Sequence, residues 1–232
     1  MNITGKTFIL AQSDGTALAI TVGLIILLIV CVILFHPWFR FVRAIKKIQK
    51  RKISDLITGE HVRVVGKLEL LDRLLVAPLS DRRCAYFQVE VDLRKGGGQN
   101  GSYWSNIINK EKFVPFWLTE GNSRVLIASM NVKGILKTDR DYDSGLFNDA
   151  TDKLKQYLNE NGYSSENIFG LNKRIQYREG VLESGEQVMA AGIVYRTTAD
   201  TLGLPGSDVI TVLVSGDCFP VYVSDDPEIV IK

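Results

Sequence analysis

The apolar run from Ala17 to Phe35, ALAITVGLIILLIVCVILF, most limits what this chain can fold into, because it contains no charged residue. As an α-helix it has a length of about 28 Å at roughly 1.5 Å per residue, close to the ~30 Å hydrocarbon core of a bilayer. Trp38 and Phe39 follow, and aromatic rings of this kind collect at the membrane interface. The sequence therefore predicts one transmembrane helix over residues 17–39.

A basic segment after the apolar run gives the predicted helix a direction. Its cationic residues are Arg40, Arg43, Lys46, Lys47, Lys50, Arg51 and Lys52. The tail before the helix, residues 1–16, carries only Lys6 and the α-amino group against Asp14. Because positive charge is retained on the cytoplasmic side, we expect the tail outside and the rest of the chain in the cytoplasm. A cleaved signal peptide has the reverse order, with its charge before the apolar core and small residues after it.

The basic segment, residues 40–54, has two interpretations. Phe41, Ile45 and Ile48 fall on one face of a helix, so this segment can lie along a membrane with its cations on anionic lipid. Alternatively, the charges form a stop-transfer flank that only sets orientation, as such a flank accompanies every single-pass anchor of this topology.

The remaining chain, residues 55–232, is dominated by strand patterns. The stretch RCAYFQVEVDLRK alternates with a period of two, which predicts a strand with a buried and an exposed face. The predicted buried face holds Ala85, Phe87, Val89, Val91 and Leu93. The predicted exposed face holds Tyr86, Gln88, Glu90, Asp92 and Arg94.

Other patterns complete the predicted domain. Strands are expected over residues 61–71, 174–178, 187–196, 208–214 and 219–224, with a hairpin turning at residues 120–122. The run GGGQNG, residues 96–101, predicts a flexible loop, and residues 149–160 predict a helix that Asp149 helps to begin. The fold class expected is mainly β (α+β): an antiparallel sheet or barrel-like domain with one helical insertion, preceded by one transmembrane helix.

No catalytic or metal-binding set emerges from the residue types. Three cysteines and two histidines at wide spacing exclude a conventional zinc finger, and Cys84 and Cys218 form no C-x-x-C motif. A reducing compartment therefore suits the chain better than a disulfide framework. His61 is expected at the surface, and Cys84, which begins a strand, is expected to be structural although Arg82 and Arg83 precede it.

The acidic run at Asp139, Asp141 and Asp143 suggests a calcium loop but departs from its pattern. That loop needs glycine at its sixth position and glutamate at its twelfth, where this chain has Ser144 and Ala150. We predict a solvated loop here, no metal and no cofactor. The net charge of +2 is too small to indicate nucleic-acid binding.

Several motifs in a fixed order resemble one known domain. They are GEHVRVVG from Gly59, APLS-x-R-x-C-x-Y from Ala77, VPFWL from Val114, R-x-x-Y-R-E-x-x-L-x-x-G-E-x-V from Arg174, and VSDDP from Val223. Over residues 55–228 the chain resembles the GIDE domain, also called the BAM domain. This domain occurs in membrane-anchored E3 ubiquitin ligases of mitochondria, the MAPL/MULAN type, and in shorter bacterial relatives.

The resemblance implies a β-rich domain held beside a membrane. The ligases carry two flanking transmembrane helices and a C-terminal RING that recruits the conjugating enzyme, whereas this chain shows no second apolar span and no Cys/His cluster. The leading hypothesis is a binding or scaffolding module at the cytoplasmic face of a bacterial inner membrane, with a protein partner at the membrane. The alternatives are a transferase of the ubiquitin-ligase class and a protein that binds anionic lipid through residues 40–52.

Overall fold

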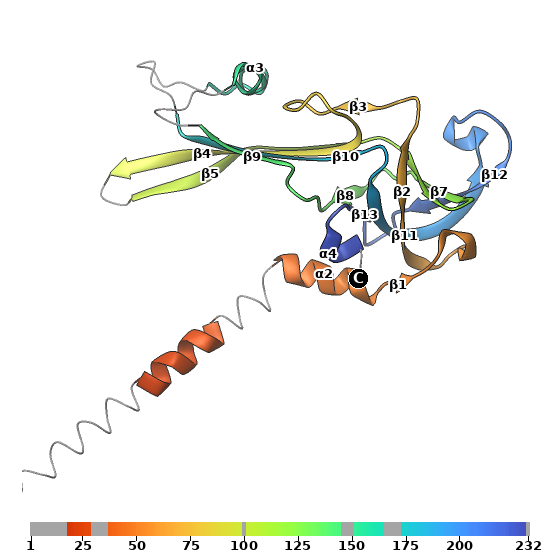
Figure 1. The fold of residues 1–232 in the computed structure, drawn as a ribbon, viewed down its shortest axis with the longest axis horizontal. Helices are drawn as coiled ribbons and strands as arrows, with labels where there is room; N and C mark the ends of the chain where they lie inside the picture. Colours follow the sequence, from red (N-terminus) through yellow and green to blue (C-terminus); the bar gives the residue numbers. More distant parts are fainter. Residues whose placement is uncertain (1–17, 29–36, 99–100, 145–150, 165–172, 231–232) are drawn as a thin grey trace, which may run out of the picture. The chain divides into compact units, whose positions relative to one another are not determined.

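The computed structural model describes residues 18–28, 37–98, 101–144, 151–164 and 173–230 (Figure 1). The chain forms two compact units, Met1–Lys47 and Ile48–Lys232. The second unit begins at Ile48, so the segment 48–54 belongs to the β-rich domain.

The first unit contains helical residues 18–28 and helix α2, Pro37–Lys47. Residues 18–28 are apolar all round, and the larger side chains among them are 48–67% exposed. On α2, Ile45 is buried and Phe41 half-buried while Lys46 and Lys47 are exposed; Ile48, the third residue of the predicted apolar face, follows the end of the helix.

Among the described residues, no helix has both the length and the apolar character needed to cross a bilayer. Ala17 and Phe35, the ends of the predicted transmembrane run, lie outside the described residues, as do residues 1–16.

The second unit is mainly β, as predicted, and its barrel is built from the larger of two sheets. The strands of this sheet are β1 (Gln49–Lys50), β2 (His61–Leu70), β6 (Phe116–Glu120), β7 (Ser123–Ile127), β8 (Val132–Gly134), β11 (Gln187–Thr198), β12 (Val209–Val214) and β13 (Val221–Ser224). Strands β2, β6, β7, β12 and β11 follow one another around a closed ring, because β11 also pairs with β2. Closure leaves these five strands without a free edge.

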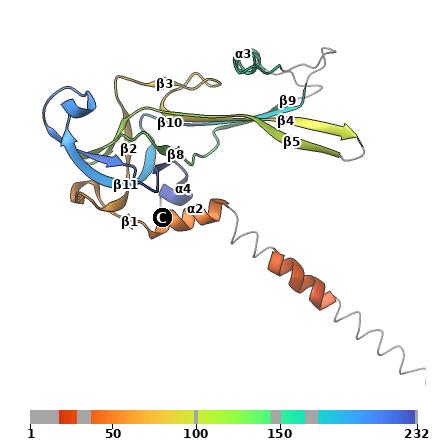
Figure 2. The same ribbon diagram turned by 180° about the vertical axis from the view of Figure 1, so that it is seen from behind.

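The smaller sheet extends from one side of the barrel (Figures 1 and 2). Its strands are β3 (Leu75–Val76), β4 (Arg83–Gly98), β5 (Gly101–Phe113), β9 (Arg140–Ser144) and β10 (Ile175–Glu183). Helix α3, Asp152–Glu160, begins at Thr151, whose hydroxyl accepts the Leu154 N–H. The remaining short elements are η1 (Ile53–Asp55), η2 (Asp200–Leu202) and α4 (Pro227–Val230).

Two hydrophobic cores hold the domain together. The first fills the barrel with residues from β2, β6, β7, β11 and β12, and it includes Tyr86 and Leu182 from the ends of β4 and β10. The second lies between α3 and the smaller sheet, where Leu154 and Leu158 join Val89 and Val91. Strand β4 therefore contributes to both cores.

Several sequence predictions need correction. The sheet is not wholly antiparallel, because β7 pairs in parallel with β12, β8 with β13, and β1 with β2. Tyr86, expected on the exposed face of its strand, is fully buried because the barrel core covers that end of β4. The predicted helix start at Asp149 lies outside the described residues, and Thr151 is the N-cap.

Two predicted loops are largely strand. Residues 96–98 and Gly101 continue β4 and β5, and residues 99–100 lie outside the described residues. Asp141 and Asp143 of the acidic run lie on strand β9, because residues 140–144 pair with β10, and Asp139 immediately precedes that strand. The hairpin between β6 and β7 is confirmed, and Gly121 takes a φ of 60° in its turn.

Candidate functional site

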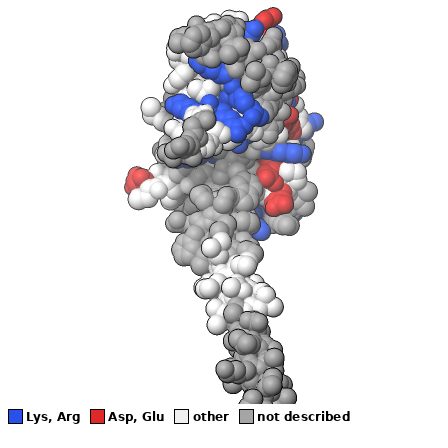
Figure 3. Space-filling view, turned by 90° about the vertical axis from the view of Figure 1, so that its left-hand side faces the viewer, with Lys and Arg blue, Asp and Glu red and all other residues white. Residues whose placement is uncertain are grey.

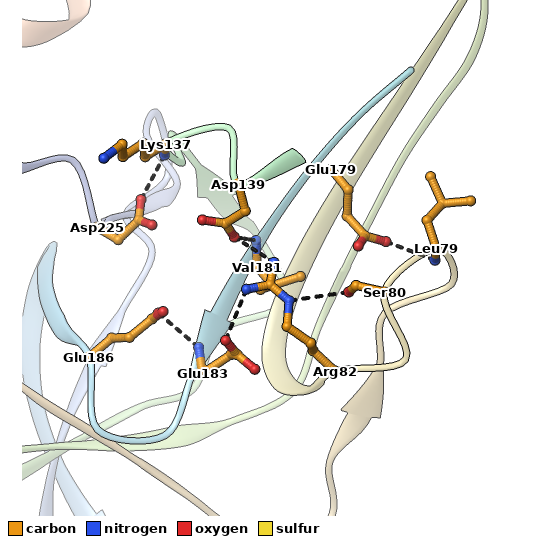
Figure 4. Close-up of polar contacts among 10 residues, drawn as sticks. All are labelled: Leu79, Ser80, Arg82, Lys137, Asp139, Glu179, Val181, Glu183, Glu186 and Asp225. Carbon is orange, nitrogen blue, oxygen red and sulfur yellow. Dashed lines mark hydrogen bonds and ion pairs between the residues drawn. The ribbon is translucent and has the colours of Figure 1, made fainter. Parts of the chain in front are cut away.

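A charged cluster forms around the turn that joins β3 to β4 (Figure 4). The turn closes through two backbone hydrogen bonds, from Ala77 N–H to Arg82 O at 2.9 Å and from Asp81 N–H to Ala77 O at 3.0 Å. Asp81 adopts a φ of 58°, a conformation that aspartate tolerates better than most residues. This geometry delivers Leu79, Ser80 and Arg82 to one side of strand β10.

Arg82 is the centre of the cluster. Its guanidinium donates to Asp139 at 2.7 Å, to Glu183 at 3.0 Å and to Ser80 at 3.2 Å. Burial alone lowers the pKa of Arg82, but its hydrogen bond to Asp139 and the charges of Asp139 and Glu183 outweigh that effect and raise the pKa. Arg82 therefore stays charged and ties the β3–β4 turn to β10 and to the segment that precedes β9.

Glu179 is a buried carboxylate next to this cluster. Its side chain is fully buried, and its Oε1 accepts the Leu79 N–H at 2.9 Å. Its Oε2 and the hydroxyl of Tyr157 on α3 are buried without a hydrogen-bond partner in the described part of the chain. Burial, followed by the charge of Glu179, raises the pKa of Tyr157. A buried carboxylate oxygen without a hydrogen-bond partner costs free energy of folding, so Glu179 is an energetically unfavourable residue at this position.

Cys84 lies at the start of β4, beside the same acidic groups. Burial raises the pKa of its thiol to about 11, and the charges of Glu179 and Glu183 add to that effect against the opposing charge of Arg82. A protonated, buried thiol is a poor nucleophile. The burial expected of a structural Cys84 is confirmed.

Two further carboxyl groups sit at the barrel side of the cluster. Asp225 accepts the Lys137 N–H at 2.8 Å, and Glu186 accepts the Glu183 N–H at 2.9 Å. Burial is the largest influence that raises the pKa of each group, and nearby carboxylates, Asp139 among them, raise both further. The hydrogen bonds of this cluster join loops and strands of both sheets, so the cluster holds these segments together rather than forming an open reaction site. We call it the clamp; its charged residues are Arg82, Asp139, Glu179, Glu183, Glu186 and Asp225.

The most prominent exposed feature is the hairpin of β4 and β5. Its far end carries Tyr103, 63% exposed, and Trp104, 42% exposed, directly across from Lys95 and Arg94. Viewed along this hairpin, lysine and arginine side chains gather on the face of the domain (Figure 3). In the described structure β5 pairs with β4 alone, so its other edge presents unpaired backbone groups.

The sequence-predicted candidates are dispersed. His61 is exposed at the start of β2, as expected, and its ring stacks on Phe219 at a centroid distance of 4.2 Å. Partial burial of the ring lowers the pKa of His61. Cys218 is exposed and is not bonded to Cys84. In the acidic run, Asp139 accepts hydrogen bonds from Arg82 and from the Val181 N–H.

The basic segment is divided between the two compact units. Arg43, Lys46 and Lys47 are exposed on α2, while the side chain of Arg40 lies outside the described residues. Lys50, Arg51 and Lys52 belong to the β-rich unit, at and just after strand β1. Sequence reasoning did not find the partners of Arg82, since Glu183 is 101 residues away and no local spacing marks the pair.

Within the described ranges, no group of three or more His, Cys, Asp or Glu side chains is placed to hold a metal ion. No protein-family model, no curated protein and no solved structure matches this chain.

Proposed function

We propose that this chain is a membrane-tethered binding module, held at the cytoplasmic face of a bacterial inner membrane, that recruits a protein partner through the β4–β5 hairpin. The observation that carries the proposal is the exposed aromatic pair Tyr103 and Trp104 at the end of a strand whose outer edge is free in the described structure. Large aromatic side chains dominate binding energy at protein interfaces, and an open strand edge can accept a partner's strand.

The tether is supported by the sequence and by residues 18–28. The helix over these residues is apolar all round, with larger side chains that are 48–67% exposed. An apolar helix of this kind is stable only where its surroundings are also apolar. The basic residues 40–52 follow it, and their charge favours the cytoplasmic side.

Membership of the GIDE family is part of the proposal. Two motifs that suggested the resemblance, from Ala77 and from Arg174, lie far apart in sequence. They meet in the clamp, where Leu79 N–H binds Glu179 and Arg82 binds Glu183. This contact supports the proposal that both motifs belong to one domain.

The test is site-specific photocrosslinking in cells that produce the full chain. A photoreactive amino acid replaces Tyr103 in one strain and Tyr195 in another; Tyr195 lies on β11 of the barrel and is 53% exposed. We expect a discrete crosslinked protein from position 103 and none above background from position 195.

A second substitution makes the result specific. Trp104→Ala is added to the chain that carries the photoreactive amino acid at position 103, which removes a neighbouring aromatic contact. A loss of about 1.4 kcal/mol of binding free energy corresponds to a tenfold weaker complex. The crosslink is therefore expected to fall about tenfold. Equal labelling from positions 103 and 195, or a crosslink that Trp104→Ala leaves unchanged, rejects the hairpin as the binding surface.

A further inference from the structure

A second candidate site lies on the barrel and does not involve the β4–β5 hairpin. It is a pocket of about 800 Å³ formed where β1 and the residues after it pass over β2 and the β6–β7 turn. Its volume falls within the ~300–1,000 Å³ typical of sites for small ligands. Its polar lining includes Lys50, Lys52, Lys67, Thr119, Glu120 and Gln187.

The fold brings the three lysines to this pocket from separate parts of the chain. Strand β1 pairs with β2 so that Lys50 lies opposite Arg63, and the Arg51 N–H donates a hydrogen bond to Arg63 O at 3.0 Å. The Ile53 N–H then donates to the Glu120 carboxylate at 2.8 Å. The segment that carries Lys50 and Lys52 is thereby fastened to the barrel.

Lys67 enters from the barrel wall. It lies on β2 with Thr119 of β6 opposite it on one side and Gln187 of β11 on the other. The three residues therefore form a row across adjacent strands, with a lysine between a threonine and a glutamine. Thr119 donates its hydroxyl proton within the sheet, to Lys67 O or to Glu69 at 3.1 Å in each case.

The charges around the pocket are unbalanced. Lys50, Lys52 and Lys67 are exposed, and none forms an ion pair with another described residue, whereas Arg51 is held by Glu60 at 3.1 Å. Glu120 is the carboxylate of the lining, and one of its oxygens is engaged by the Ile53 N–H. Three ammonium groups thus face one carboxylate.

We infer that this pocket binds a phosphate group. Phosphate oxygens accept charge-assisted hydrogen bonds, lysine is a common phosphate ligand, and an anion balances the excess positive charge of the lining. The same chemistry is offered by a phospholipid headgroup and by a soluble phosphate compound. In the sequence, residues 36–49 separate Lys50 from the apolar run, so a lipid headgroup is one of the two sources that the experiment compares.

The experiment uses the full chain and has two arms. In the first, native mass spectrometry in a neutral detergent compares retention of phosphatidylglycerol with retention of phosphatidylcholine. In the second, the chain in phosphatidylcholine nanodiscs is titrated with inorganic phosphate and with glycerol 3-phosphate by calorimetry. The pocket variant carries Lys50→Ala, Lys52→Ala and Lys67→Ala.

A matched variant controls for overall charge. It carries Arg73→Ala, Lys133→Ala and Arg196→Ala, three exposed cationic residues outside both the pocket lining and the β4–β5 hairpin. We expect the pocket variant to lose affinity for the phosphate ligand by about tenfold or more, since it removes three donors of charge-assisted hydrogen bonds. The matched variant is expected to keep its affinity, and that affinity is expected to fall at high salt.

Each result decides the inference. Binding to phosphatidylglycerol alone supports the site and identifies a lipid headgroup as the source; binding in the second arm supports it with a soluble ligand. Equal behaviour of the pocket and matched variants, or no phosphate binding by the unaltered chain in either arm, overturns it. If the triple variant alters the near-UV circular dichroism spectrum, the single change Lys67→Ala at an exposed position replaces it.

Discussion

Replacing Arg82 by methionine tests the clamp most directly. Methionine keeps the apolar stem of the side chain but removes the guanidinium that binds Asp139 at 2.7 Å and Glu183 at 3.0 Å. Both carboxylates then remain beside Glu186 and Asp225 without that positive charge. The change therefore isolates the electrostatic contribution of the clamp.

The magnitude follows from the two ion pairs. A hydrogen bond that involves a charged group contributes about 1.5–3 kcal/mol to stability. The side chains of Asp139 and Glu183 are 23% and 32% exposed, so water partly replaces the lost partner. We expect Arg82→Met to lower the free energy of unfolding by about 2–3 kcal/mol at pH 7, less than the sum of both bonds.

The salt dependence separates charge from packing. Salt screens interactions between partly exposed charges, so the stability that Arg82 contributes is expected to fall as the salt concentration rises. The difference between the variant and the unaltered chain is therefore expected to be smaller at about 1 M salt than at about 0.05 M. Urea unfolding of the full chain in detergent at both salt concentrations, followed by near-UV circular dichroism, measures the difference.

The adjacent arginine supplies the control. Arg83 is exposed and forms no ion pair with another described residue, so Arg83→Met is expected to change stability by less than about 0.5 kcal/mol. A similar loss for both variants, or a loss for Arg82→Met that is equal at low and high salt, refutes the electrostatic account of the clamp.

Two further predictions concern buried groups. Because burial and neighbouring carboxylates raise the pKa of Cys84 to about 11, iodoacetamide at pH 8 is expected to alkylate Cys218 and not Cys84 in the folded chain, as read by peptide mass spectrometry; equal labelling contradicts the burial of Cys84. A Cβ on Gly134 lies 2.4 Å from the buried ring of Tyr86, so Gly134→Ala is expected to cost about 1–3 kcal/mol in the same unfolding assay. That cost should largely disappear in a Tyr86→Ala background; an unchanged cost there rules out the steric explanation.

Local patterns were sufficient to predict most of the strands and the main helix of the domain. Alternation over residues 83–95 predicted β4, and the apolar spacing after residue 150 predicted α3, because each signal depends on neighbours in sequence. The same alternation misplaced Tyr86. Its burial comes from the barrel core that covers the start of β4, and nothing within the strand itself marks that contact.

The sequence by itself determined an apolar run, its charge asymmetry and a β-rich chain, since each is a property of composition and short-range order. Only the tertiary structure decided that β7 and β12 close the barrel in parallel, that Arg82 meets Glu183 and that Lys67 joins Lys50 and Lys52. These contacts join residues far apart in the chain. Their pairing depends on which strands become neighbours, and that outcome is set by the packing of the whole domain rather than by any local spacing.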